Sequence, residues 1–147
     1  PELQAMVAAA ARDGTILTLG SGYRSPALQK FFFDNYAAQD GVEAANKYSA
    51  LPGQSEHQTG LALDFAAGDM TCYLEQCFAD TPEGKWLATH AHEYGFILRY
   101  TREGEATTGY QFEPWHYRYV GKDLAGALHQ ENMLLEDAWP LLLHVGR

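Results

Sequence analysis

Residues 55–64 read SEHQTGLALD, a histidine and an aspartate on either side of a glycine and a short apolar run. The run from Leu61 to Ala66 has the length and composition of a buried strand. Side chains alternate across a strand, so Asp64 shares its face with alanines and can be approached closely. A buried carboxylate is costly unless it is paired or binds a metal. Because Gly60 allows the chain to turn, His57 can reach the same point, and a metal ion would account for both residues.

Residues 112–116, FEPWH, contain the best third ligand, His116. A catalytic zinc usually has three protein ligands, and the aromatic residues around this histidine would exclude water from a metal site. Pro114 interrupts regular strand pairing, which can aim the Glu113 carboxylate at the metal as a neighbour rather than a ligand. Such a carboxylate can accept a proton from a water that the metal has acidified. Two histidines, one aspartate and a spare glutamate are therefore typical of a metal-dependent hydrolase.

The two spacings, H-x6-D and E-x2-H, are weak signals on their own. Structural roles stay open for all three ligand candidates. His57 can be an ordinary loop histidine, Asp64 a cap at a strand end, and His116 a core histidine with satisfied hydrogen bonds.

Composition indicates one globular domain over residues 1–147. Hydrophobic residues make up 46% and charged residues 20%, an ordinary balance for such a domain. No apolar run approaches the roughly 20 residues that a membrane span needs. The net charge is −9, with ten lysines and arginines spread along the chain. Nucleic-acid binding is therefore not expected, because a duplex binder presents a basic patch.

Helices and strands are mixed without a regular alternation, which predicts an α+β fold. Propensity and capping signals predict helices at 2–12, 26–38, 41–48, from 82 to a stop at Gly95, and from 123 onward with breaks near Asn132 and Pro140. Strands are predicted at 15–19, 61–66, 96–101 and 110–120, the last two as a hairpin across a polar turn at 102–109. Residues 20–22 are predicted to form a turn. The expected inward face of the 26–38 helix consists of Leu28, Phe31, Phe32 and Tyr36.

The two cysteines, Cys72 and Cys77, leave two interpretations open. In an exported protein they form the one available internal disulfide, and otherwise they are reduced thiols. The sequence begins at Pro1 without a signal-peptide pattern. We therefore expect a mature or trimmed domain, with any export signal or N-terminal membrane anchor lying outside it.

Arg24 stands immediately before a predicted helix start, in the segment SGYRS at residues 21–25. Backbone N–H groups at a helix start favour anions, and an arginine fork matches a carboxylate through two hydrogen bonds. Arg24 is thus a candidate clamp for a substrate carboxylate. Its position in the sequence also suits an ordinary surface arginine.

Three segments together resemble the VanY-type D-alanyl-D-alanine carboxypeptidases: SGYRS at 21–25, SEHQTGLALD at 55–64 and EPWH at 113–116. This group of zinc peptidases shares its fold with the D-Ala-D-Ala dipeptidases, lysostaphin-type enzymes and the Hedgehog signalling domain. The resemblance covers about residues 15–125. It implies a small central antiparallel sheet that carries a zinc site and is flanked by helices.

The resemblance also implies the roles of the site residues. Zn²⁺ would be held by His57, Asp64 and His116, and Glu113 would be the catalytic base. The C-terminal carboxylate of the substrate would be bound by Arg24, with help from Ser55 and Gln29.

The substrate implied by the resemblance is a peptidoglycan stem peptide or its precursor. The enzyme would remove the C-terminal D-alanine by D,D- or L,D-cleavage. It would work as a monomer at the cell envelope, outside the cytoplasm.

Two other functions fit part of the pattern. Two histidines and a carboxylate also form the iron site of non-haem Fe(II) oxygenases, although that class usually places the first two ligands closer together. A non-catalytic cell-wall-binding module that keeps the metal for stability is the second alternative. The presence of both Glu113 and Arg24 argues against it.

Overall fold

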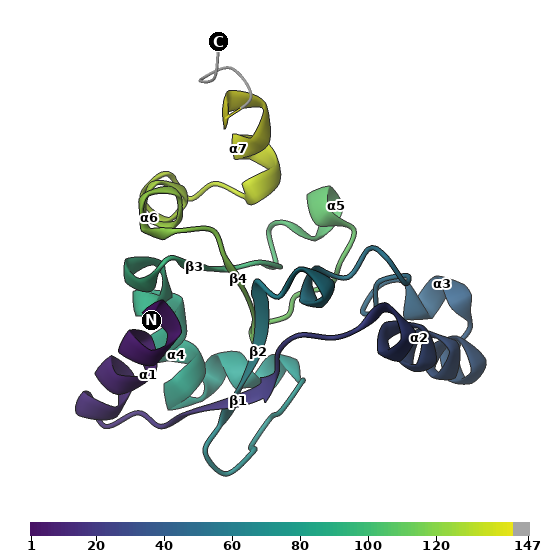
Figure 1. Cartoon of the computed structure of the whole chain (residues 1–147), viewed down its shortest axis with the longest axis horizontal. Coiled ribbons are helices and arrows are strands. Elements are labelled where there is room, and N and C mark those ends of the chain that lie inside the picture. The colour runs from purple at the N-terminus through teal and green to yellow at the C-terminus, as the bar shows by residue number, and fades with distance from the viewer. Residues whose placement is uncertain (143–147) are drawn as a thin grey trace.

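The computed structural model describes residues 1–142 and contains a four-stranded antiparallel sheet in the order β1-β2-β4-β3 (Figure 1). The expected α+β class is therefore confirmed. The strands are β1 (Leu17–Ser21), β2 (Ala62–Ala67), β3 (Phe96–Leu98) and β4 (His116–Tyr119). The helices are α1 (Glu2–Arg12), α2 (Pro26–Asp40), α3 (Val42–Ala45), α4 (Pro82–His90), α5 (Glu105–Thr108), α6 (Lys122–Glu131) and α7 (Leu135–Leu142). Three 3₁₀ turns complete the elements: η1 (Glu56–Thr59), η2 (Gln76–Asp80) and η3 (Ala91–Tyr94).

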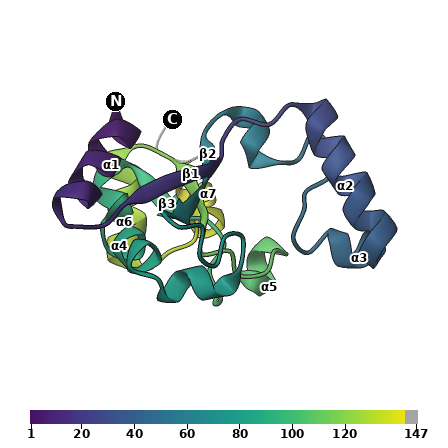
Figure 2. The same ribbon diagram turned by 90° about the horizontal axis from the view of Figure 1, so that it is seen from below.

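The helices lie in two groups around the sheet. Both views place α1, α4 and α6 together, while α2 and α3 stand apart beyond the other side of the sheet (Figures 1 and 2). The apolar core lies with the first group, where Met6 of α1 and Trp86 and Leu87 of α4 pack with Phe65 and Tyr117 of the sheet. Alternation along β2 consequently turns Asp64 toward the α2–α3 side.

The predicted helix starts are confirmed by their caps. The Ser25 hydroxyl accepts a hydrogen bond from the backbone N–H of Leu28, and that of Thr81 accepts one from Gly84. In each case a proline occupies the first helical turn, where its missing N–H costs nothing. The predicted helix at 2–12 has the observed bounds, and the break near Asn132 is also confirmed, because that residue caps α6 in a left-handed conformation.

Several strand predictions were wrong in their bounds. β1 begins at Leu17 and ends at Ser21, inside the predicted turn at 20–22, with an irregular register between Leu19 and Ser21. A Cβ on Gly20 would lie only 2.2 Å from the Tyr73 ring. This glycine therefore marks a close approach within a strand. β4 is far shorter than the predicted 110–120, because the backbone around Pro114 does not extend the ladder. β3 and β4 do pair, but α5 lies in the connection that was predicted to be a plain turn.

Three helix predictions also need correction. The inward face of α2 consists of Gln29 and Phe33, whereas Leu28 and Phe31 are 44% and 61% exposed. The Gln29 amide turns inward because it donates to the backbone carbonyl of Ala50. The helix predicted at 41–48 is limited to α3. α4 ends at His90 and continues as η3 before Gly95.

The predicted break at Pro140 was wrong, because α7 continues through this residue. The fixed φ of proline is itself helical, so α7 keeps its backbone conformation at Pro140 and loses only the one hydrogen bond that this residue cannot donate.

The two cysteines form a disulfide, so the disulfide alternative is the correct one. The bond closes the segment between β2 and η2, in which Met70, Cys72 and Leu74 all have positive φ. Among the described residues, no helix has the length and apolar character needed to cross a membrane.

Two helical glycines give a matched test of packing around α4. We expect Gly84→Ala to lower the free energy of unfolding by about 1–3 kcal/mol, because its Cβ would lie 2.0 Å from the backbone oxygen of Phe78. Gly126→Ala in α6 has no atom within 4 Å of the new Cβ and should raise that free energy by up to about 1 kcal/mol. Urea unfolding of both variants measures the difference. Equal effects would contradict the close contact of α4 with the residues that precede it.

Candidate metal centre

Three separate segments bring His57, Asp64 and His116 together. Asp64 of β2 lies directly opposite His116 of β4 in the antiparallel register. His57 comes from η1, the turn that precedes β2. All three side chains are buried, and one ligand atom of each lies within 4.8 Å of the others.

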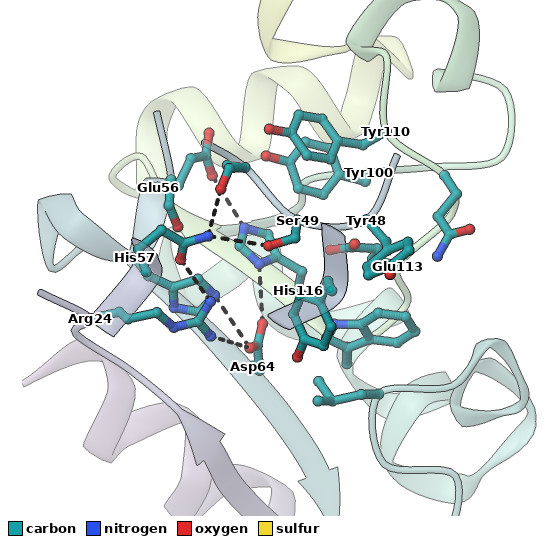
Figure 3. Close-up of a pocket in the computed structure, with 17 residues that line it drawn as sticks. Arg24, Tyr48, Ser49, Glu56, His57, Asp64, Tyr100, Tyr110, Glu113 and His116 are labelled. Carbon is teal, nitrogen blue, oxygen red and sulfur yellow. Dashed lines mark hydrogen bonds and ion pairs between the residues drawn. The ribbon is translucent and has the colours of Figure 1, made fainter. Parts of the chain in front are cut away.

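The Asp64 carboxylate lies between the two imidazoles (Figure 3). His57 Nε2 is 3.3 Å from Asp64 Oδ2, and His116 Nδ1 is 3.1 Å from Asp64 Oδ1. The two rings are nearly perpendicular, at 80°, with their centroids 5.0 Å apart. Two ring nitrogens and two carboxylate oxygens therefore face a common point.

The outer nitrogen of each ring has its own partner. His57 Nδ1 lies 2.7 Å from the carbonyl oxygen of Gly22. That oxygen can only accept, so Nδ1 carries a proton, and Nε2 is the nitrogen that has a free lone pair when the ring is neutral, as a metal ligand must be. The backbone N–H of Arg24 donates in return to the carbonyl of His57, so two hydrogen bonds connect the segment after β1 with η1.

The same close packing sets the charge of these groups in the metal-free protein. Burial alone would raise the pKa of Asp64, but hydrogen bonds from His116 and His57 hold it well below its usual range. Burial would likewise lower the pKa of His116, and the carboxylates of Asp64 and Glu56 instead raise it to about 9. Without a metal, the site is thus an ion-paired cluster of a carboxylate and an imidazolium.

The donor set fits a zinc ion. Two imidazole nitrogens and one carboxylate oxygen are the ligands of many catalytic zinc sites, which keep a further position open. The proton that ties His116 to Asp64 can be replaced by a metal, because a ligand histidine must be neutral at its coordinating nitrogen. The cluster borders a cavity of about 230 Å³, which leaves room for water and a substrate group.

The candidate base, Glu113, lines this cavity with the three metal-ligand candidates. It precedes β4, and its backbone N–H donates to the carbonyl of Tyr100, which fixes the segment beside the sheet. The side chain is only 6% exposed, and burial raises its pKa to about 8, with nearby Asp64 adding to the shift against the opposing effect of His116. A carboxyl group with such a pKa can both accept and release a proton near neutral pH.

The candidate substrate clamp, Arg24, reaches the same cavity from the other side (Figure 3). Its guanidinium donates to Gln29 Oε1 at 3.0 Å and to Ser21 Oγ at 3.2 Å, and it lies 3.8 Å from Asp64 Oδ2. Gln29 is itself fixed by its bond to Ala50. The structure therefore brings Arg24 and Gln29 into contact.

Ser55 is buried and lines the cavity. All seven predicted site residues consequently lie around one cavity: Arg24, Gln29, Ser55, His57, Asp64, Glu113 and His116.

Sequence reasoning missed Glu56, whose Oε2 lies 3.3 Å from His116 Nε2. Glu56 directly precedes His57 in the segment 55–64. Adjacent side chains in a turn point in different directions, so this position did not indicate that Glu56 would reach the site. Sequence reasoning also missed Tyr100, which stacks on the His116 ring with centroids 5.0 Å apart, and Tyr110, which stacks on Tyr100.

The known proteins that this chain resembles in sequence and in structure are carboxypeptidases. The family model described as VanY: D-alanyl-D-alanine carboxypeptidase matches residues 1–122. YodJ of Bacillus subtilis (strain 168) is 43% identical over 135 residues, which cover 92% of this chain and 50% of YodJ. The chain spans about half the length of the first curated relatives that it matches.

Two solved structures are similar over nearly the whole chain. The LdcB LD-carboxypeptidase has a TM-score of 0.88 at 42% identity, with 95% of this chain and 65% of that one covered. A mutant of the vancomycin-resistance D,D-pentapeptidase VanY in complex with Zn(II) has a TM-score of 0.83 at 34% identity, with 93% and 79% covered.

The metal-free protein should lose stability as the pH rises from about 6.5 to 9. The pKa of His116 is raised from 6.5 to about 9, so its contribution is complete below 6.5 and is lost as the pH rises through 9. The raised pKa of Glu113 acts in the same direction between 4.5 and about 8. Melting temperatures measured with a chelator across this range test the prediction.

Glu113→Gln is the control for that measurement, because the amide does not titrate. Its melting temperature should fall less steeply with pH than that of the wild type. A wild-type melting temperature that stays constant or increases over this range would contradict the proposed charge states.

Proposed function

This chain belongs to the VanY family of D-alanyl-D-alanine carboxypeptidases, and we propose that it is a zinc enzyme that removes the C-terminal D-alanine from peptidoglycan stem peptides. The observation that carries the proposal is the shared cavity: three convergent ligand atoms, a buried carboxyl group and an arginine surround the same space. Together they supply what hydrolysis of a C-terminal peptide bond requires.

The zinc ligands would be His57 Nε2, His116 Nδ1 and the Asp64 carboxylate. When bound, zinc supplies Lewis-acid chemistry, which acidifies water and polarises a peptide carbonyl. His57 is prepared for this role by the proton on its Nδ1, which the Gly22 carbonyl holds in place. Burial of all three residues excludes bulk water from the reacting groups.

Arg24 would anchor the free carboxylate at the end of the substrate. Its hydrogen bonds to Gln29 and Ser21 direct the guanidinium toward the cavity, and stacking over Phe32, 5.2 Å from the ring centroid, supports it from the side. An anchored carboxylate fixes which peptide bond lies at the reacting centre, and Ser55 on the cavity wall can assist.

Glu113 would move the proton. Its carboxylate takes a proton from the attacking water while a C–O bond forms at the peptide carbon. It then delivers that proton to the nitrogen of the leaving D-alanine as the C–N bond breaks. The raised pKa supports this exchange, because a pKa near the working pH makes both transfers favourable.

The two other functions considered for this sequence receive less support. The family match and the similar peptidase structures favour peptide hydrolysis over an Fe(II) oxygenase. A non-catalytic binding module would have no use for a buried carboxyl group and an arginine aimed into one cavity.

We also propose that the enzyme acts at the cell envelope, outside the cytoplasm. The Cys72–Cys77 disulfide supports an oxidising environment, and the substrate of such a peptidase lies in the cell wall. Because every residue of the proposed site comes from one chain, we propose that a monomer within the single domain 1–147 is sufficient.

Mass spectrometry of products from muramyl tetrapeptide and pentapeptide tests the activity and separates L,D- from D,D-cleavage. We expect release of D-alanine from at least one substrate and its loss with a chelator. Full activity after metal removal would reject the zinc mechanism.

Glu113→Gln should lower kcat by about 10²–10⁴-fold, because it removes the proton acceptor. Zinc content should stay at one ion per chain, because Glu113 is not a proposed ligand. The two measurements together distinguish loss of the base from loss of the metal. Turnover close to wild type in this variant would remove Glu113 from the proposed role.

Arg24→Ala should raise KM by about 10–100-fold for substrates with a free C-terminal carboxylate, since it removes a charge-assisted hydrogen-bond donor. The matched substrate has an amidated C-terminus, and the wild type should process it poorly. Equal cleavage of the acid and the amide by the wild type would show that no carboxylate is recognised.

A further inference from the structure

Glu56 contacts the metal-ligand candidate His116 from the side that faces away from the cluster. The Glu56 Oε2 atom lies 3.3 Å from His116 Nε2, while Nδ1 of the same ring faces Asp64 (Figure 3). The two nitrogens of His116 therefore have different surroundings. One faces the proposed zinc position, and the other faces a carboxylate outside it.

This carboxylate is itself held in place. Arg99 Nε donates to Glu56 Oε1 at 2.8 Å, and an Arg118 guanidinium nitrogen lies 3.5 Å from the same oxygen. The Glu56 side chain is 15% exposed and that of Arg99 is 11% exposed. Two arginines on one oxygen leave Oε2 directed at the His116 ring.

Arg99 is in turn held by the C-terminal helix. Both of its terminal nitrogens donate to Glu136 of α7, one of them at 3.0 Å, in a fork-to-fork pair. The residues that match the family model end at 122, before α7 begins. A continuous set of contacts thus connects Glu136, Arg99, Glu56 and His116, from α7 to the proposed zinc site.

We propose that Glu56 is a positioning residue that fixes the ring and tautomer of His116 for metal binding, and that α7 supports it through Glu136 and Arg99. An ionised carboxylate can only accept hydrogen bonds, so Glu56 requires the proton on Nε2. The lone pair then lies on Nδ1, which faces Asp64 and the proposed ion. This inference rests on the metal site of the proposed function, and it assigns that site an outer residue and a supporting helix.

A purely structural ion pair is the competing explanation. In that case Glu56 neutralises Arg99 and Arg118, and its loss changes stability without a specific effect on zinc or on the His116 ring. Zinc affinity distinguishes the two explanations, because it should not respond if Glu56 only balances charge.

Glu56→Gln is the informative variant, because the amide has nearly the same shape but can also donate. Its NH₂ group can donate to Nε2 and so favour the tautomer with the proton on Nδ1, which cannot bind zinc through that atom. We expect zinc affinity, measured by competition with a fluorescent chelator, to fall by about 10–100-fold. Exposed Glu103→Gln is the matched control and should bind zinc as the wild type does.

The zinc-loaded proteins give a second readout by NMR. In the wild type, the His116 Nε2–H proton should resonate downfield and exchange slowly, because it is bonded to a carboxylate. In Glu56→Gln it should move upfield and exchange faster. Unchanged zinc affinity would overturn the role of Glu56 even if the resonance moves, because a changed neighbour alone can shift a ring N–H.

Glu136→Ala tests the contribution of α7 and leaves the buried cluster intact. We expect a loss of zinc affinity of at least about threefold that disappears in the Glu56→Gln background, because both residues act through one set of contacts. Additive losses, or no loss from Glu136→Ala, would overturn the link to α7. If Glu56→Gln fails to fold, the single variant still tests the proposal, because an unchanged zinc affinity in Glu136→Ala would overturn it.

The wild-type titration separates this inference from the function on which it rests. A wild type that does not bind one zinc ion would reject the proposed metal site. A wild type that binds zinc and a Glu56→Gln variant that binds it equally well would reject only the positioning role.

Discussion

The pairing of β2 with β4 is the constraint on which the site depends. It places Asp64 directly opposite His116, although the two are far apart in the sequence. On the opposite face, Phe65 packs edge-on against Tyr117 within the core, with ring centroids 5.7 Å apart. A slip by one residue would turn Asp64 into the core and Phe65 toward the cavity. Burial of apolar rings on one face thus maintains the register of polar groups on the other.

Asp64 and Glu113 lie in different surroundings, which suit them to different chemical roles. Both line one cavity and both are buried, but Asp64 lies between two imidazoles and stays ionised. At Glu113 burial outweighs the opposing charges of His116 and Arg24, so the raised pKa favours the neutral form. Groups whose surroundings separate their pKa values in this way are suited to different chemical roles. Asp64 suits a permanent ligand, and Glu113 suits an exchangeable proton, as we propose.

Local signals predicted the parts of the fold that local chemistry controls. The caps at Ser25 and Thr81 and the break at Asn132 follow from individual residues and were found where expected. Several of the wrong predictions concern contacts between distant segments. The inward face of α2 follows from the bond of Gln29 to a loop about twenty residues away, which no periodicity in the helix reveals. The strands predicted at 96–101 and 110–120 were too long, because pairing partners, rather than composition, determine where a ladder ends.

The metal-ligand candidates could be found from sequence because residue type, burial and family motif all indicated the same side chains. Glu56 could not be found in this way. Its relation to His116 depends on how η1 packs against β4 and on an arginine that begins the segment after β3. Contacts of this kind leave no mark on local spacing, because each partner alone has the appearance of an ordinary surface charge.

The segment that carries the Cys72–Cys77 disulfide contributes to the wall of the cavity but to none of its proposed metal ligands. The chain leaves β2 just after Asp64, passes through the cross-linked segment and returns Leu74 to the cavity wall. The cross-link joins Cys72 to Cys77 within this segment, outside β2, whose pairing with β1 and β4 does not involve it. Substitutions in the cross-linked segment can therefore reshape the cavity wall at Leu74 and leave in place the groups that we propose for the metal and the proton.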